Sequence, residues 1–166
     1  MNRRTLIPAA LLGLLLMFAA AAWAEEKNGV QLTVSRKTLD RNDTRSTFYY
    51  YDRIDRTQGL KITVKNVSFK PMPEGEVEWT LLVRKYASTT VEKYSGTEKL
   101  EALKPANSAD LVLGAAQISG WRDVSERYKD KLEYQVIVKH GGAETVRTES
   151  TPSFDALKKR AIKAAS

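Results

Sequence analysis

The chain has 166 residues, carries 27 Lys and Arg against 20 Asp and Glu for a formal net charge of +7, and contains no cysteine. The lack of cysteine excludes disulfides, thiol catalysis and cysteine-ligated metals. This length predicts one domain, large enough to bury a hydrophobic core without covalent crosslinks.

Residues 1–24 have the three-part pattern of a secretory signal peptide. Two arginines precede an apolar stretch over residues 6–22, and the small-residue site Ala22-Trp23-Ala24 comes before two glutamates. We expect export and cleavage after Ala24, which leaves a periplasmic or extracellular protein with a net charge of about +5. An uncleaved membrane anchor is the alternative for this apolar length, although Pro8 counts against it.

The rest of the chain reads as short strands separated by turn residues. Period-two alternation of apolar and polar residues predicts strands with one face on a core. Such stretches cover residues 29–39, 59–68, 76–86, 132–139 and 145–151. Less regular strands are expected at residues 44–51 and 88–94, and on both sides of a turn at residues 105–108. Turns or loops are expected at residues 40–43, 70–75 and 141–142, and a single helical turn at residues 120–131.

The strand at residues 76–86 has the most apolar inward face. Val77, Trp79, Leu81 and Val83 share that face, and Glu78 lies on the other. A tryptophan contributes a large buried area and needs one partner for its indole N–H. We therefore expect Trp79 to anchor the core.

Residues 152–166 form a basic amphipathic tail, in which Ser153 is expected to cap a short helix. The apolar stripe of this helix consists of Phe154, Leu157, Ala161, Ile162 and Ala165. The tail cations are Lys158, Lys159, Arg160 and Lys163. They are a candidate contact for an anionic polymer or for a peripheral membrane surface.

Regularly spaced strands without long helices between them predict an all-β fold. We expect a single immunoglobulin-like antiparallel sandwich of about seven to nine strands over residues 25–151. Ile62, Trp79 and Val136 stand where an immunoglobulin domain carries Cys, Trp and Cys, and Tyr134 stands at the place of its corner tyrosine. Residues 29–151 thus resemble an immunoglobulin-like or fibronectin-III-like sandwich with aliphatic residues in place of the disulfide.

The whole chain also resembles the small secreted immunoglobulin-like proteins of verrucomicrobial gut bacteria that are encoded beside type IV pilus components. The signal, the cysteine-free sandwich and the lysine-rich tail carry this resemblance. It implies a non-enzymatic accessory or adhesion role, with an envelope or pilus-associated protein as the partner. It brings no catalytic residues and no cofactor, and folds of this class host many functions.

The aromatic run at residues 48–51 suggests a binding surface. If Phe48 and Tyr50 face inward, then the tyrosines between and after them point outward beside two arginines. Tyrosine and arginine are enriched at binding surfaces. The candidate partner-binding residues are Tyr49, Tyr51, Arg45 and Arg53. Two alternatives stay open, namely that the C-terminal stripe covers this face, or that exposed rings stack on a glycan in a carbohydrate-binding module.

The sequence gives little support for catalysis, metal binding or nucleic-acid binding. The only histidine, His140, is expected to be exposed at the 141–142 turn, and no hydrolase serine or zinc-protease motif is present. The acids from Asp40 onward begin like a calcium loop, but Arg45 and Tyr51 replace the required glycine and bidentate acid. Basic residues mixed with acids predict a solvated surface, so we expect no nucleic-acid partner and no metal.

Overall fold

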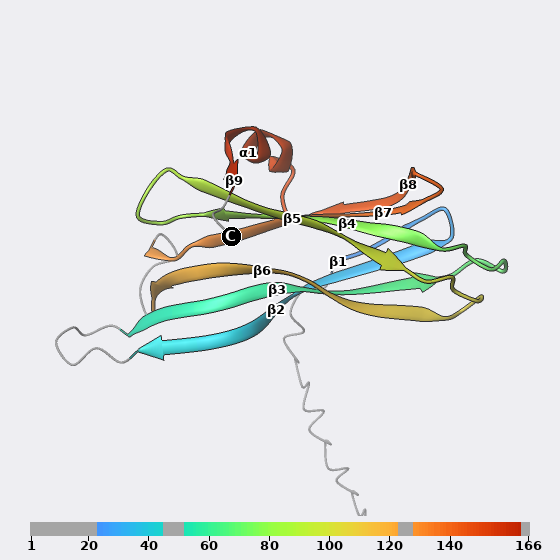
Figure 1. Cartoon of the computed structure of the whole chain (residues 1–166), viewed down its shortest axis with the longest axis horizontal. Coiled ribbons are helices and arrows are strands. Elements are labelled where there is room, and N and C mark those ends of the chain that lie inside the picture. The colour runs from blue at the N-terminus through green and yellow to red at the C-terminus, as the bar shows by residue number, and fades with distance from the viewer. Residues whose placement is uncertain (1–22, 45–51, 123–127, 164–166) are drawn as a thin grey trace, which may run out of the picture.

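The computed structural model describes residues 23–44, 52–122 and 128–163. Two sheets stack as layers, and helix α1 (Phe154–Arg160) lies on the outside of one of them (Figure 1). The predicted all-β sandwich is therefore confirmed. In the described ranges, no helix is long and apolar enough to cross a membrane.

The first sheet is antiparallel throughout. Asn28 and Gly29 join its first two strands in a tight turn, with φ values of 53° and 75° that match the turns preferred by β-hairpins. In spatial order the strands are β1 (Trp23–Lys27), β2 (Val30–Thr44), β3 (Arg53–Asn66) and β6 (Ser108–Trp121).

The second sheet is antiparallel except for its last pair, in which β9 runs parallel to β5. The predicted hairpin turn at Gly141 and Gly142 is confirmed, and both residues have positive φ. In spatial order the strands are β8 (Ala143–Glu149), β7 (Lys131–His140), β4 (Gly75–Arg84), β5 (Val91–Leu100) and β9 (Ile162–Lys163).

The strand order supports the immunoglobulin-like prediction. Counted from β2, the first, second and fifth strands share one sheet, and the third, sixth and seventh share the other, as in immunoglobulin sandwiches. The fourth strand, β5, pairs with β4 instead of β6. Ile62 on β3 and Val136 on β7 are fully buried in the same core, where a disulfide would otherwise join the sheets.

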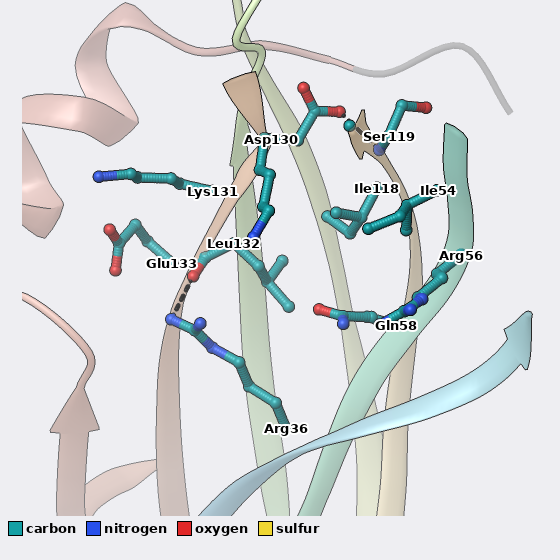
Figure 2. Close-up of a pocket in the computed structure, with 12 residues that line it drawn as sticks. Arg36, Ile54, Arg56, Gln58, Ile118, Ser119, Asp130, Lys131, Leu132 and Glu133 are labelled. Atoms are coloured by element: carbon teal, nitrogen blue, oxygen red, sulfur yellow. Dashed lines mark hydrogen bonds between the residues drawn. The ribbon is translucent and has the colours of Figure 1, made fainter. Parts of the chain in front are cut away.

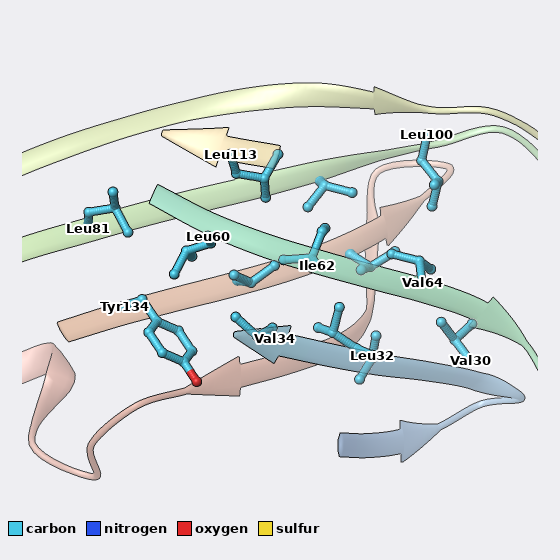
Figure 3. Packing of buried hydrophobic residues seen from close by; sticks show 14 of the residues in the cluster. Val30, Leu32, Val34, Leu60, Ile62, Val64, Leu81, Leu100, Leu113 and Tyr134 are labelled. Atoms are coloured by element: carbon cyan, nitrogen blue, oxygen red, sulfur yellow. The ribbon is translucent and has the colours of Figure 1, made fainter. Parts of the chain in front are cut away.

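Alternating residues of both sheets fill the space between them (Figure 3). Leu32, Ile62 and Leu81 are completely buried there, as period-two alternation predicts. Burial of each such side chain contributes about 1.5–3 kcal/mol. Trp79 packs against this core but is only half-buried, and its Nε1 has no hydrogen-bond partner among the described residues. The expectation that the indole N–H finds a hydrogen-bond partner is therefore wrong.

The turn expected at residues 40–43 is also wrong, because these residues belong to β2. The strand continues past a register shift between Thr38 and Asp40 and pairs with the start of β3 up to Thr44 opposite Arg53. Cross-strand charge pairs hold this polar extension, and they override the turn preference of Asp and Asn. The strand expected at residues 44–51 lies, apart from Thr44, outside the described residues.

Further boundaries also differ from the prediction, and β3 begins at Arg53 and not at Gly59. The strand expected at residues 88–94 begins at Val91 and continues to Leu100 as β5. Gly96 lies within it and leaves room for the Trp79 ring. Gly120 and Trp121 end β6 and do not begin a helical turn.

Helix α1 docks on the outer face of the second sheet. Phe154 is fully buried against Leu82 and Val91, and Leu157 packs beside it. Ile162 leaves the predicted stripe and is 59% exposed, because it pairs with β5 through its backbone. The stripe residues Phe154 and Leu157 thus cover β4 and β5. The alternative that the stripe covers the aromatic run stays a prediction, because that run lies outside the described residues.

The predicted cap of this helix is also wrong in detail. Ser153 occupies the N-cap position but makes no side-chain capping hydrogen bond. The docked position of α1 therefore comes from its buried apolar face.

Candidate binding cleft

A cleft of about 350 Å³ opens between the sheets where β6 ends and β7 begins (Figure 2). Its apolar lining comes from one residue on each of three strands, namely Ile54 on β3, Ile118 on β6 and Leu132 on β7. Ile118 and Leu132 are buried, and Ile54 is half-buried. Polar side chains from both sheets surround this apolar part, an arrangement typical of ligand sites.

Arg36 bridges the two sheets beside the cleft. It extends from β2, and its Nη2 donates to the carbonyl oxygen of Leu132 on β7 at 2.6 Å (Figure 2). Arg36 makes no ion pair with the described residues. A guanidinium has five N–H donors, so this side chain retains donors and an uncompensated charge for a ligand.

The two acids of the cleft are neutralised by cations that do not line it. Asp130 is buried, and its carboxylate accepts from Lys85 Nζ at 3.1 Å and from the backbone N–H groups of Tyr86 and Ser119, each at 3.0 Å. Burial lowers the pKa of Lys85, but the hydrogen bonds and charges of Asp130 and Glu92 outweigh it and raise that pKa overall. Asp130 therefore adds little negative charge to the cleft.

The negative charge of Glu133 is compensated by a cation in the same way. Its Oε1 lies 3.3 Å from Arg84 Nη2, and its Oε2 accepts a hydrogen bond from Ser150 Oγ at 2.7 Å. Lys131, by contrast, is exposed and makes no ion pair with the described residues. Arg36 and Lys131 thus leave the cleft positive, which favours an anionic ligand.

An ion-pair cluster ties together the strands next to the cleft. Asp43 on β2 accepts from Arg41 Nε at 2.6 Å, from Arg56 Nη2 at 3.0 Å and from Arg122 after β6. The hydrogen bond from Arg56 is the largest influence holding the pKa of Asp43 well below its usual range. The acid-rich stretch therefore binds arginines, and the described residues contain no acid and histidine group suited to a metal ion.

The predicted partner-binding residues are only partly described. Tyr49, Tyr51 and Arg45 lie outside the described residues. Arg53 begins β3 with an exposed side chain, and its Nε lies 2.8 Å from Asp55 Oδ2. Its charge is therefore compensated, and it does not line the cleft.

The four tail cations have separate surroundings. Lys158 donates to Gln135 Oε1 at 3.4 Å, whereas Lys159 and Arg160 are exposed. Lys163 pairs with Lys93 through the β5–β9 bridge, and its side chain lies outside the described residues. The structure thus distinguishes four residues that the sequence grouped together.

The expectation of an exposed His140 is wrong. The ring is half-buried, because β7 extends through this residue and Gly75 lies against the ring. Its Nδ1 lies 2.8 Å from Thr145 Oγ1, and its buried Nε2 has no partner among the described residues. Burial lowers the pKa of His140.

Arg36 was not among the predicted site residues, although the alternation of the strand pointed to it. Val30, Leu32 and Val34 alternate inward, and Arg36 continues the same alternation. A charged residue at an inward position of a strand marks a place where the core ends or a site begins.

No protein-family model matches the chain, and no curated protein is similar to it. Among solved structures, the chain is similar to a crystal structure from Akkermansia muciniphila, a verrucomicrobial protein. The two share 10% identity with a TM-score of 0.37, over 86% of this chain and 84% of that one. A likeness this distant says nothing about activity.

Proposed function

We propose that this is an exported, non-enzymatic binding protein, an accessory or adhesion component of a cell-envelope or pilus-like assembly. In this proposal the cleft holds an acidic, extended segment of a partner protein. The observation that carries it is the pair of uncompensated cations, Arg36 and Lys131, beside an apolar lining. Complementary charge would steer the partner, and the apolar lining would hold it.

A protein partner suits the described surface better than a glycan. Sugar rings are bound by exposed aromatic side chains. In the described part of the chain, the large exposed aromatic residues are Phe69 and Tyr128, which lie in different connections between strands. They do not form a stacking platform on one element.

Crosslinking in the native envelope tests this proposal. The double variant Arg36→Gln, Lys131→Gln should lose the partner that the parent chain captures, because the two lining cations on which the proposal rests are removed. Lys65→Gln is the matched control, since Lys65 is an exposed cation on β3 outside the cleft with no described ion pair. Equal capture by the double variant and the control would reject the cleft as the binding site.

Thermal melts of the same variants separate a loss of binding from a loss of stability. Arg36 also donates a hydrogen bond to Leu132, so its removal affects stability as well as charge. The single variant Lys131→Gln breaks no described contact and should weaken capture without changing the melting temperature.

A further inference from the structure

A second hollow, of about 240 Å³, lies between helix α1 and the hairpin that joins β4 to β5. Arg84 lines it at the end of β4, and Leu157 and Arg160 line it from α1. Three successive hydroxyl residues of the hairpin, Ser88, Thr89 and Thr90, complete the polar part. The hollow shares no residue with the cleft described above.

The docking of α1 creates this hollow. Phe154 is fully buried against Leu82 and Val91, which holds the helix on the second sheet. Arg160 lies in the last turn of that helix and is thereby placed beside the hairpin. Neither segment forms the hollow alone.

Two arginines of the hollow have unused donors. Arg84 Nε is buried without a hydrogen-bond partner among the described residues, while Arg84 Nη2 contacts Glu133 at 3.3 Å. Arg160 is exposed and makes no hydrogen bond or ion pair within the described ranges. A buried N–H without an acceptor is costly, so an acceptor supplied by a ligand would be favourable there.

The remaining groups also favour an anion. No acid lines the hollow, and Lys85 is already paired with Asp130 at 3.1 Å and Glu92 at 3.3 Å. Ser88 Oγ accepts the backbone N–H of Thr90 at 3.2 Å, which leaves its own proton free to donate. Guanidinium forks and hydroxyl donors match the oxygens of a phosphate or sulfate group.

We propose that this hollow binds a tetrahedral oxyanion group, phosphate or sulfate, as a free ion or as part of an anionic lipid headgroup. Arg160 provides the charge, Arg84 provides its unpaired Nε–H donor, and the hairpin hydroxyls orient the oxygens. Arg160 alone among the tail cations lines this site. The hollow and the cleft share no lining residue, although they touch where Arg84 contacts Glu133, so this proposal rests on different observations from the function proposed above.

Titration of the exported chain with inorganic phosphate and with sulfate, followed by amide NMR, tests the site. The largest shifts are expected at residues 88–91 and at Arg160. Arg160→Gln should weaken binding about tenfold or more, because a charge-assisted hydrogen bond is lost. Lys159→Gln is the matched control, since Lys159 is an exposed cation on the same helix that does not line the hollow, and it should change the affinity less than about twofold.

Vesicles distinguish the two sources of the oxyanion. Binding to phosphatidylglycerol vesicles that Arg160→Gln reduces more than Lys159→Gln assigns the site to a headgroup. Binding of inorganic phosphate without vesicle binding assigns it to a free ion. Phe154→Ala should abolish either binding by releasing α1. Equal losses in the Arg160 and Lys159 variants, or shifts spread over all surface lysines, would mean an adventitious ion only and would overturn the proposal.

Discussion

The Trp79 side chain restricts which residues fit beside it on the neighbouring strands. Its ring lies against Gly96 on β5 and Gly114 on β6. A Cβ added at Gly96 would lie 2.6 Å from Trp79 Cζ2, and one added at Gly114 would lie 2.9 Å from Trp79 Cζ3. The two glycines therefore admit the indole between β5 of one sheet and β6 of the other, which explains why a glycine stands in the middle of β5.

Gly96→Ala is expected to cost about 1–3 kcal/mol of unfolding free energy, because the new methyl group overpacks the indole. In a Trp79→Ala background the same change should be neutral or stabilising, since alanine restricts the unfolded chain. Denaturant melts of the four variants measure this coupling. Ser95→Ala, at an exposed neighbouring position, is the control. An equal cost in both backgrounds would show that the ring is not the obstacle.

His140 should make the fold sensitive to mild acid. Burial lowers the pKa of His140 in the folded chain below its usual value of 6.5, so the unfolded chain binds the proton more tightly. The contribution of neutral His140 to the free energy of unfolding is fully present above about pH 6.5. It is lost as the pH falls toward the pKa of His140 in the folded chain. Because the chain has only this histidine, His140→Asn should flatten the change in melting temperature between about pH 7 and pH 5. An unchanged slope in the variant would assign the effect to other groups.

At the scale of elements, β2 and β3 form a hairpin that extends beyond the hydrophobic core. Its inner half is held by buried aliphatic residues such as Leu32 and Ile62, and its outer half by the arginines around Asp43. Exposed ion pairs contribute little individually, but a shared carboxylate that is mostly shielded from solvent links three segments at once. The cluster thus stiffens the strands that form one wall of the cleft.

Helix α1 is held by its apolar contacts and gains little from its own propensity at this length. Phe154→Ala is expected to cost about 3–5 kcal/mol of unfolding free energy, because it removes a fully buried ring from Leu82 and Val91 and releases α1. Ile162→Ala, at a position 59% exposed, should cost under about 0.5 kcal/mol. Denaturant melts measure both. Similar small losses at the two positions would show that α1 does not cover Leu82 and Val91.

At the scale of the whole molecule, the predicted processing site falls within the first strand. Ala24 is the register partner of Thr33, and Trp23 is the partner of Val34. Cleavage after Ala24 would shorten β1 to residues 25–27 and leave the outer edge of β2 unpaired from Thr33 onward. The charged residues of β2, among them Arg36 and Lys37, would then protect that edge from pairing with another chain.

Intact mass of the protein from its native host tests the export prediction. The mature chain should begin at Glu25, because the small residues before it suit the processing enzyme. A mature protein that still carries Met1 and sediments with membranes would show that the apolar segment is an anchor.

The sequence by itself determined the fold class and the core strands. Alternation at Ile62, Leu81 and Val136 is a local pattern, and a strand with a single apolar face has to bury that face against another layer. The apolar stripe of the tail was equally local, so the short helix was predictable from Phe154 and Leu157. These patterns need no knowledge of which strand lies next to which.

Only the tertiary structure decided the sites and the polar segments. Residues 40–43 form a strand because Asp43 meets Arg56 across a hairpin, a pairing that turn propensity does not contain. Asp55 compensates the charge of Arg53, whereas Arg36 became a candidate because β7 brings the carbonyl group of Leu132 into its reach. Charge compensation depends on distances between residues far apart in the chain, and a sequence records the charges without those distances.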